Sequence, residues 1–102
     1  MTTQSLIDEL DKEWDDENGF FGRLRSGFFD QRSFEHVVQI LQSVKGGDTE
    51  CLDRRLVSLT WYIPLFMSWQ RERVEEQDGN IKGLDVATNK ATSLLEEILG
   101  VP

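Results

Sequence analysis

The fold of this chain depends most on the segment Leu56–Trp69, which reads LVSLTWYIPLFMSW. Here and in the flanks, apolar residues occupy two sides of a helix rather than one. The first side consists of Leu52, Leu56, Leu59, Ile63, Phe66 and Val74, and the second of Val57, Trp61, Leu65 and Trp69. A helix that is apolar nearly all round is normally enclosed by protein. The segment is therefore predicted to be the buried central helix of the fold.

This central helix is predicted to begin at Asp48 or Thr49, whose side chains can cap its first amides, and to end near Gln77. Pro64 lies inside it. Proline lacks a backbone N–H donor, and its ring crowds the carbonyl four residues earlier. The helix is therefore expected to kink or split in two near Pro64.

The N-terminal segment has the spacing of an amphipathic helix from about Gln4 to Asn18. Gly19 follows it, where a left-handed C-terminal cap belongs. The apolar face of this helix consists of Leu6, Ile7, Leu10 and Trp14. A short helix over Phe20–Arg25 is predicted next, with phenylalanines that close the end of the core. The alternative is that Phe20–Phe29 forms an exposed docking patch.

Two more amphipathic helices complete the plan. One begins near Asp30 to Ser33, ends near Val44 before the pair Gly46-Gly47, and has the apolar stripe Phe34, Val37, Val38, Leu41 and Val44. The last begins near Leu84 or Asp85, ends at Gly100 and has the apolar face Leu84, Ala87, Ala91, Leu94, Leu95 and Ile98. The prediction is one all-α domain over residues 1–102: an antiparallel bundle of four main helices plus the short aromatic helix.

The formal net charge of −8 is unevenly distributed along the chain. Residues 1–19 carry seven acidic residues against Lys12, which gives −6. A strongly negative protein repels nucleic acid and anionic lipid, so neither is expected as a partner. A basic protein is the electrostatically favoured partner, although acidic surfaces also simply keep proteins soluble.

The apolar run Leu56–Trp69 is too short to cross a bilayer, and the N-terminus lacks the apolar core of a secretory signal. Cys51 is the only cysteine, so an internal disulfide is impossible. We therefore expect a cytoplasmic protein. Cys51 is expected in the first turn of the central helix as a packed, unreactive thiol.

The sequence offers little material for catalysis or metal binding. His36 is the only histidine, and it falls off the apolar stripe of its helix. One histidine and one cysteine cannot build a zinc site. The acidic loops around Asp11 and Asp78 do not match an EF-hand, and no phosphate-binding glycine loop is present. We therefore expect a protein that is not an enzyme and that uses no cofactor or metal.

Carboxylates follow the N-terminal helix in two rows. The first row is Asp8, Asp11 and Asp15, and the flanking row is Glu9, Glu13 and Asp16. Acidic side chains near the N-terminus of a helix interact favourably with the helix dipole, whereas acidic side chains near the C-terminus interact unfavourably with it. This locally unfavourable placement points to a functional use, with a solvated charged face as the alternative. The predicted partner-binding residues are Asp8, Asp11, Glu13, Asp15 and Asp16.

The segment Leu24–Phe34, which reads LRSGFFDQRSF, is a glycine turn that leads into an amphipathic helix. With its small size, acidity and helical content, the chain resembles bacterial immunity proteins of the nuclease-colicin and contact-dependent growth inhibition systems. The resemblance is one of type and transfers no site residue. It implies one tight partner, a toxin domain such as a basic nuclease, that acidic side chains neutralise.

A second hypothesis is a regulatory or scaffold module that dimerises through helix faces. In that case the aromatic residues Trp61, Trp69, Phe28 and Phe29 would be exposed at the interface. An enzyme of unrecognised type is the third reading, and a deep pocket around Arg54, Arg55 and Tyr62 would favour it. The mass of the protein in solution separates the first hypothesis from the second.

Overall fold

The computed structural model describes residues 2–102, whose regular secondary structure is helical, with no strand among those residues. The prediction of an all-α fold is confirmed. The predicted count of four main helices and one short helix is wrong, since the described chain forms seven helical segments. These are α1 (Thr3–Glu13), α2 (Phe20–Arg25), α3 (Gln31–Lys45), α4 (Arg54–Thr60), α5 (Ile63–Trp69), α6 (Arg71–Glu76) and α7 (Ile81–Leu99).

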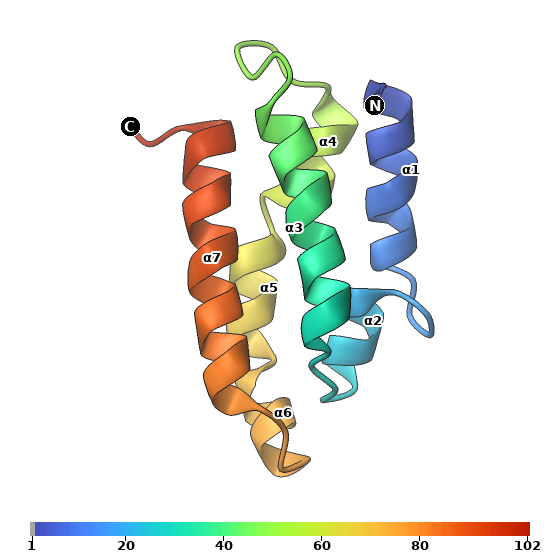
Figure 1. The fold of residues 1–102 in the computed structure, drawn as a ribbon, viewed down its shortest axis with the longest axis vertical. Coiled ribbons are helices and arrows are strands. Elements are labelled where there is room, and N and C mark those ends of the chain that lie inside the picture. The colour runs from blue at the N-terminus through green and yellow to red at the C-terminus, as the bar shows by residue number, and fades with distance from the viewer. Residues whose placement is uncertain (1) are drawn as a thin grey trace.

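The chain runs alternately down and up the long axis of the molecule (Figure 1). It descends through α1, ascends in α3, descends through α4, α5 and α6, and returns upward in α7. The described residues measure 40 × 29 × 19 Å along the principal axes, so the molecule is about twice as long as it is thick. None of the helices in residues 2–102 has the length and apolar content needed to cross a membrane.

The core is built from the apolar stripes that face this common interior. All six predicted residues of the α7 face are buried, because they recur at the helical period on a helix that packs against both α3 and α5. In α3 the stripe also includes Ile40, which is buried, whereas the predicted Val38 is only half-buried. Phe20, Phe21 and Leu24 of α2 are buried, so the phenylalanines at the start of this segment belong to the core as expected.

The first helix ends five residues earlier than predicted, at Glu13 instead of Asn18. Trp14 turns inward there: its indole N–H donates to the carbonyl of Leu59 at 3.0 Å, and its ring stacks on Phe21 at 4.2 Å. Gly19 is therefore not a left-handed C-cap. It has a φ of −83° and is the N-cap of α2, where an added Cβ would overlap the carbonyl oxygen of Glu13.

The predicted central helix is divided into α4, α5 and α6. The expected split near Pro64 is confirmed, since Pro64 lies in the first turn of α5, where a missing N–H is tolerated. A second break occurs at Gln70. The helix also starts later than predicted, because Asp48 accepts a hydrogen bond from the amide of Glu50 in a local turn, and Asp53 caps α4 instead.

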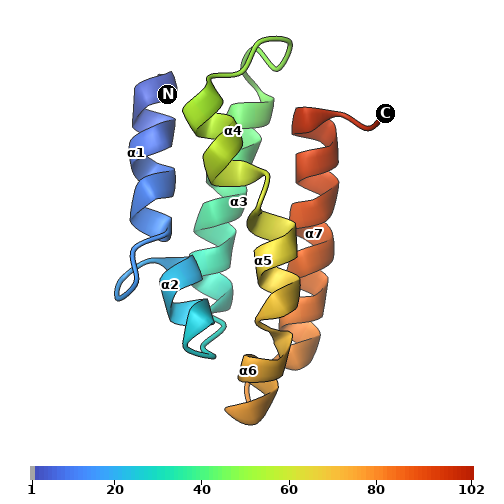
Figure 2. The ribbon, with the colours of Figure 1, turned by 180° about the vertical axis from the view of Figure 1, so that it is seen from behind.

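The prediction that Leu56–Trp69 is fully enclosed is wrong. Trp61, Leu65 and Trp69 are 55%, 40% and 59% exposed, whereas Ile63 and Phe66 on the other side of the segment are buried. Figure 2 shows the reason, because α4, α5 and α6 lie at the front of this view with no helix over them. A chain of this length has too few helices to surround the segment. The last helix also begins earlier than predicted, at Ile81, because Asn80 caps it.

Candidate protein-binding surfaces

The five predicted partner-binding residues divide between a helix and a turn. Asp8, Asp11 and Glu13 lie on α1, whereas Asp15 and Asp16 lie in the turn that follows it. All except Glu13, which is half-buried, are exposed. Because α1 ends at Glu13, the two rows of carboxylates do not continue at helical spacing into that turn.

Most of these carboxylates already have a partner within the chain. Asp11 forms an ion pair with Arg55 of α4 at 2.7 Å, and Asp16 forms one with Arg25 of α2 at 2.9 Å. Asp8 accepts a hydrogen bond from the side chain of Gln4 at 2.9 Å. Asp15 instead accepts hydrogen bonds from two backbone amides of its own turn, those of residues 17 and 18. Their placement therefore has a structural use, which sequence reasoning did not anticipate.

His36 connects α3 to α1. Its Nε2 lies 3.3 Å from a carboxylate oxygen of Glu9, and its Nδ1 lies 3.4 Å from one of Glu13. The histidine is exposed, as its position off the apolar stripe predicted. Within residues 2–102, no group of three or more histidine, cysteine or acidic side chains could hold a metal ion.

Three of the five predicted residues meet at an open hollow beside the C-terminal end of α1. We call this the acidic hollow; it measures about 480 Å³ and is lined by Asp11, Lys12, Glu13, Asp15 and Asn18. Three carboxylates and one ammonium group give the lining a net charge of −2. The dipole of α1 adds a partial negative charge at this end of the helix. The acidic hollow therefore offers a surface that favours a positively charged group.

The second surface is the exposed side of α4 and α5, which sequence reasoning had placed in the core. The ring of Tyr62 lies between two exposed indoles, 5.3 Å from the ring of Trp61 and 5.8 Å from that of Trp69. Leu65, which is four residues from both Trp61 and Trp69 in the sequence, is exposed as well. An apolar patch that is open to water and rich in tryptophan and tyrosine is typical of a protein–protein interface.

The exposure of these aromatic residues agrees with one alternative read from the sequence. Trp61, Trp69 and Phe28 are all more than half exposed, as a dimerising module would require. Phe29 is not, because it packs partly against the core next to Phe20. The aromatic segment after α1 is therefore mostly core, with Phe28 as its exposed member.

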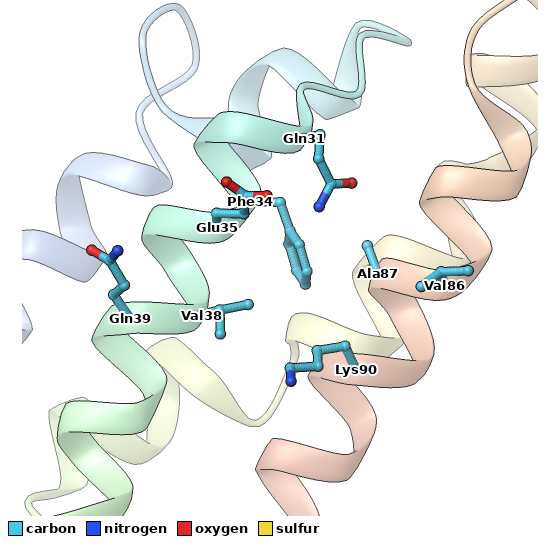
Figure 3. Close-up of a pocket in the computed structure, with 8 residues that line it drawn as sticks. All are labelled: Gln31, Phe34, Glu35, Val38, Gln39, Val86, Ala87 and Lys90. Atoms are coloured by element: carbon cyan, nitrogen blue, oxygen red, sulfur yellow. The ribbon is translucent and has the colours of Figure 1, made fainter.

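A third surface is the groove between α3 and α7, which sequence reasoning missed (Figure 3). Its floor is formed by Phe34, Val38 and Ala87, and its volume is about 430 Å³. Glu35 of α3 and Lys90 of α7 stand on its opposite walls. Val38 is half-buried and Val86 is exposed, and both are apolar residues at the edges of the buried stripes. These two residues were the signal in the sequence that could have indicated the groove.

Cys51 lies in the loop before α4 and is exposed, so its prediction as a packed residue in the first helical turn is wrong. The helix it was assigned to begins only at Arg54.

Comparison of the chain with protein-family models, with curated proteins and with solved structures found no match.

Proposed function

We propose that this protein is a non-enzymatic binding domain, an antiparallel helical bundle that recognises a basic protein through the acidic hollow. In its most specific form the proposal is an immunity protein. It would neutralise a cognate toxin, such as a basic nuclease, in the bacterial cytoplasm.

The observation that carries this proposal is the meeting of Asp11, Glu13 and Asp15 at one open hollow on a chain of net charge −8. Asp15 forms no ion pair within residues 2–102, so its carboxylate is available to a lysine or arginine of a partner. Complementary charge accelerates association and selects the partner. The carboxylates of Asp8 and Asp16 lie outside the lining and would act at its rim.

The first experiment tests the toxin. The C-terminal domain of an exported protein encoded directly upstream should arrest growth when expressed alone and should be harmless when this protein is co-expressed. Stable complex formation between the two purified proteins is expected. A toxic domain that this protein fails to neutralise would contradict the immunity form of the proposal.

The second experiment tests the acidic hollow in that complex. The triple variant Asp8→Asn, Asp11→Asn and Asp15→Asn removes three charges, while the asparagine at position 15 keeps a side-chain oxygen for the two turn amides that Asp15 binds. Binding should weaken at least about tenfold, and its salt dependence should flatten. The matched control removes three charges elsewhere, with Glu35→Gln, Glu50→Gln and Glu96→Gln. If both triple variants lost the same binding affinity, net charge alone would explain the effect, and the acidic hollow would not be the contact surface.

The exposed indoles of Trp61 and Trp69 favour a second candidate function, a module that assembles through its aromatic face. This candidate requires no foreign partner. Because it uses α4 and α5 rather than α1, it is compatible with the first.

A further inference from the structure

The exposed aromatic residues belong to a longer stripe along α4, α5 and α6. Its members are all exposed and are spaced by four or three residues: Arg54, Ser58, Trp61, Leu65, Trp69, Glu72 and Glu76. This is the spacing of residues on one side of a helix that faces another helix. The intervals are symmetric about Leu65, since the order 4, 3, 4 on one side is mirrored by 4, 3, 4 on the other.

The stripe continues across the breaks between the three helices. Trp61, Tyr62 and Gln70, where the helices are interrupted, keep right-handed helical backbone angles. The ring of Tyr62 contacts the rings of both Trp61 and Trp69, so the two indoles share one side. The three helices follow one another down the molecule on the face shown in Figure 2. The stripe is therefore one continuous surface, with an apolar middle and charged ends.

The two ends carry opposite charge. Arg54 lies at the α4 end, and Glu72 and Glu76 lie at the α6 end. None of these three forms an ion pair within the part of the chain that the structure describes. The neighbouring Arg55 and Arg71, by contrast, are paired with Asp11 and Asp85. Within residues 2–102, the charges of Arg54, Glu72 and Glu76 are therefore unpaired, unlike those of Arg55 and Arg71.

We propose that a second copy of this chain docks on the stripe in the antiparallel direction, with a two-fold axis near Leu65. The symmetric spacing then brings Trp61 against the partner's Trp69 and Arg54 against the partner's Glu76, and the same contacts recur on the other side of the axis. A two-fold dimer requires such a self-complementary surface. Parallel docking would instead oppose Arg54 to its own copy and Glu76 to its own copy, which costs energy.

The length of the stripe suits such a dimer. The 22-residue interval from Arg54 to Glu76 corresponds to about 33 Å of helix, close to the 40 Å long dimension of the molecule. Buried tryptophans at the centre of an interface contribute more than most other residues. The proposal does not rest on the acidic hollow, because α1 contributes no residue to the stripe.

Sedimentation and light scattering over a range of concentrations test this dimer. The wild-type protein should change from 11.8 kDa towards twice that mass as its concentration rises to about 1 mM. The double variant Trp61→Ala and Trp69→Ala should stay monomeric at the same concentration and keep its helical circular dichroism, since both side chains are exposed. A wild-type protein that stays monomeric throughout would overturn the proposal.

Charge exchange tests the antiparallel register. Arg54→Glu places two acids opposite each other at both ends of the dimer, and Glu76→Arg places two arginines there. Each single variant should raise the dimer dissociation constant about tenfold, because the two-fold axis doubles each repulsion. The controls Arg32→Glu and Glu96→Arg make the same charge changes away from the stripe and should leave the constant unchanged.

An equimolar mixture of the two single variants should recover dimerisation. At one end of the mixed dimer, the acid introduced by Arg54→Glu in one chain meets the arginine introduced by Glu76→Arg in the other. At the other end, the unchanged Arg54 and Glu76 meet as in the wild type. The double variant Arg54→Glu with Glu76→Arg should recover dimerisation as well. If both single variants weaken the dimer but neither the mixture nor the double variant recovers it, the antiparallel register is wrong.

Discussion

Single side chains decide where several helices begin and end. The inward turn of Trp14, with its hydrogen bond to Leu59, accompanies the end of α1 five residues before the predicted boundary. Asp30 caps α3, because its carboxylate accepts hydrogen bonds from the amide and the hydroxyl of Ser33. Gln70 lies between α5 and α6 and is only 8% exposed.

The cap at Asp30 should make α3 sensitive to acid. The hydroxyl of Ser33, and to a lesser extent its amide and the charge of Arg23, hold the pKa of Asp30 below its ordinary value. A carboxyl whose pKa is lower in the folded state stabilises the fold above its unfolded pKa of about 3.9. That stabilisation disappears as the pH falls through the lowered folded pKa.

The variant Asp30→Ala should therefore lose about 1 kcal/mol of unfolding free energy at pH 7, and the difference from wild type should shrink as the pH falls below about 4. Urea denaturation at several pH values measures both effects. Asp30→Asn keeps an acceptor for the Ser33 amide and serves as the control. A wild-type–alanine difference that stays constant down to a pH of about 2 would show that the carboxylate charge contributes nothing.

Gln70 should be a weak point of the fold. Its Oε1 is buried with no hydrogen-bond partner within the described residues. An unpaired buried acceptor costs about 1–3 kcal/mol, so Gln70→Leu should raise the unfolding free energy by about 1 kcal/mol. The control Gln42→Leu, at an exposed position of α3, should change it little. A loss of stability in Gln70→Leu would indicate that water or a shifted side chain satisfies this oxygen.

At the scale of elements, α2 is short but central. It is only six residues long, yet Phe20, Phe21 and Leu24 are buried. Phe21 stacks on Trp14 of the turn after α1 and meets the ring of Phe66 of α5 edge-on at 6.0 Å. Gly22 lets α2 approach that turn, because an added Cβ would overlap the carbonyl oxygen of Asp15. Aromatic packing therefore holds α2, α5 and the end of α1 together.

Truncation of Phe21 should consequently affect more than its own helix. Phe21→Ala removes a fully buried ring and should cost about 3–5 kcal/mol, a large part of the stability of an ordinary small domain. The control Phe28→Ala removes a ring that is 57% exposed and should change stability by less than about 0.5 kcal/mol. Chemical denaturation measures the loss of unfolding free energy in both variants. Similar losses would show that Phe21 does not hold the core together as described.

At the scale of the whole molecule, the helices cover one side of α4 and α5 and leave the other open. The most extensive packing joins α7 to α3 and α5, and α1 to α3 and α4. Trp61 and Trp69 are more than half exposed, and α4 and α5 lie at the front of Figure 2 with no helix over them. This open side is the physical basis of the proposed dimer, and the charge concentrated on α1 is the basis of the proposed basic partner.

Quenching of tryptophan fluorescence should report the exposure of Trp61 and Trp69 directly. The chain has three tryptophans, and only Trp14 is packed against the core. At micromolar concentration, acrylamide should quench the wild-type protein strongly. It should quench the double variant Trp61→Phe and Trp69→Phe weakly, because only the sheltered Trp14 then remains. Similar quenching of the two proteins would mean that the outer side of α4 and α5 is covered.

The sequence by itself determined the helical class and the parts of the fold that depend on short-range spacing. The buried face of α7, most of the stripe of α3, the ends of these helices at glycine and the break near Pro64 all follow from residues within a few positions of one another. These features are local because helical periodicity, glycine and proline act through the backbone of their own turn. The same local signals identified Phe20 and Phe21 as core.

Only the tertiary structure decided which side of Leu56–Trp69 is covered, since both sides are apolar and the number of helices available to cover them is a property of the whole chain. It also decided where α1 ends, because Trp14 contacts Leu59 and Phe66, which lie 45 or more positions away in the sequence. The pairing of Asp11 with Arg55 likewise joins residues 44 positions apart. Such contacts depend on how the helices pack, and that packing leaves no periodic mark on the sequence.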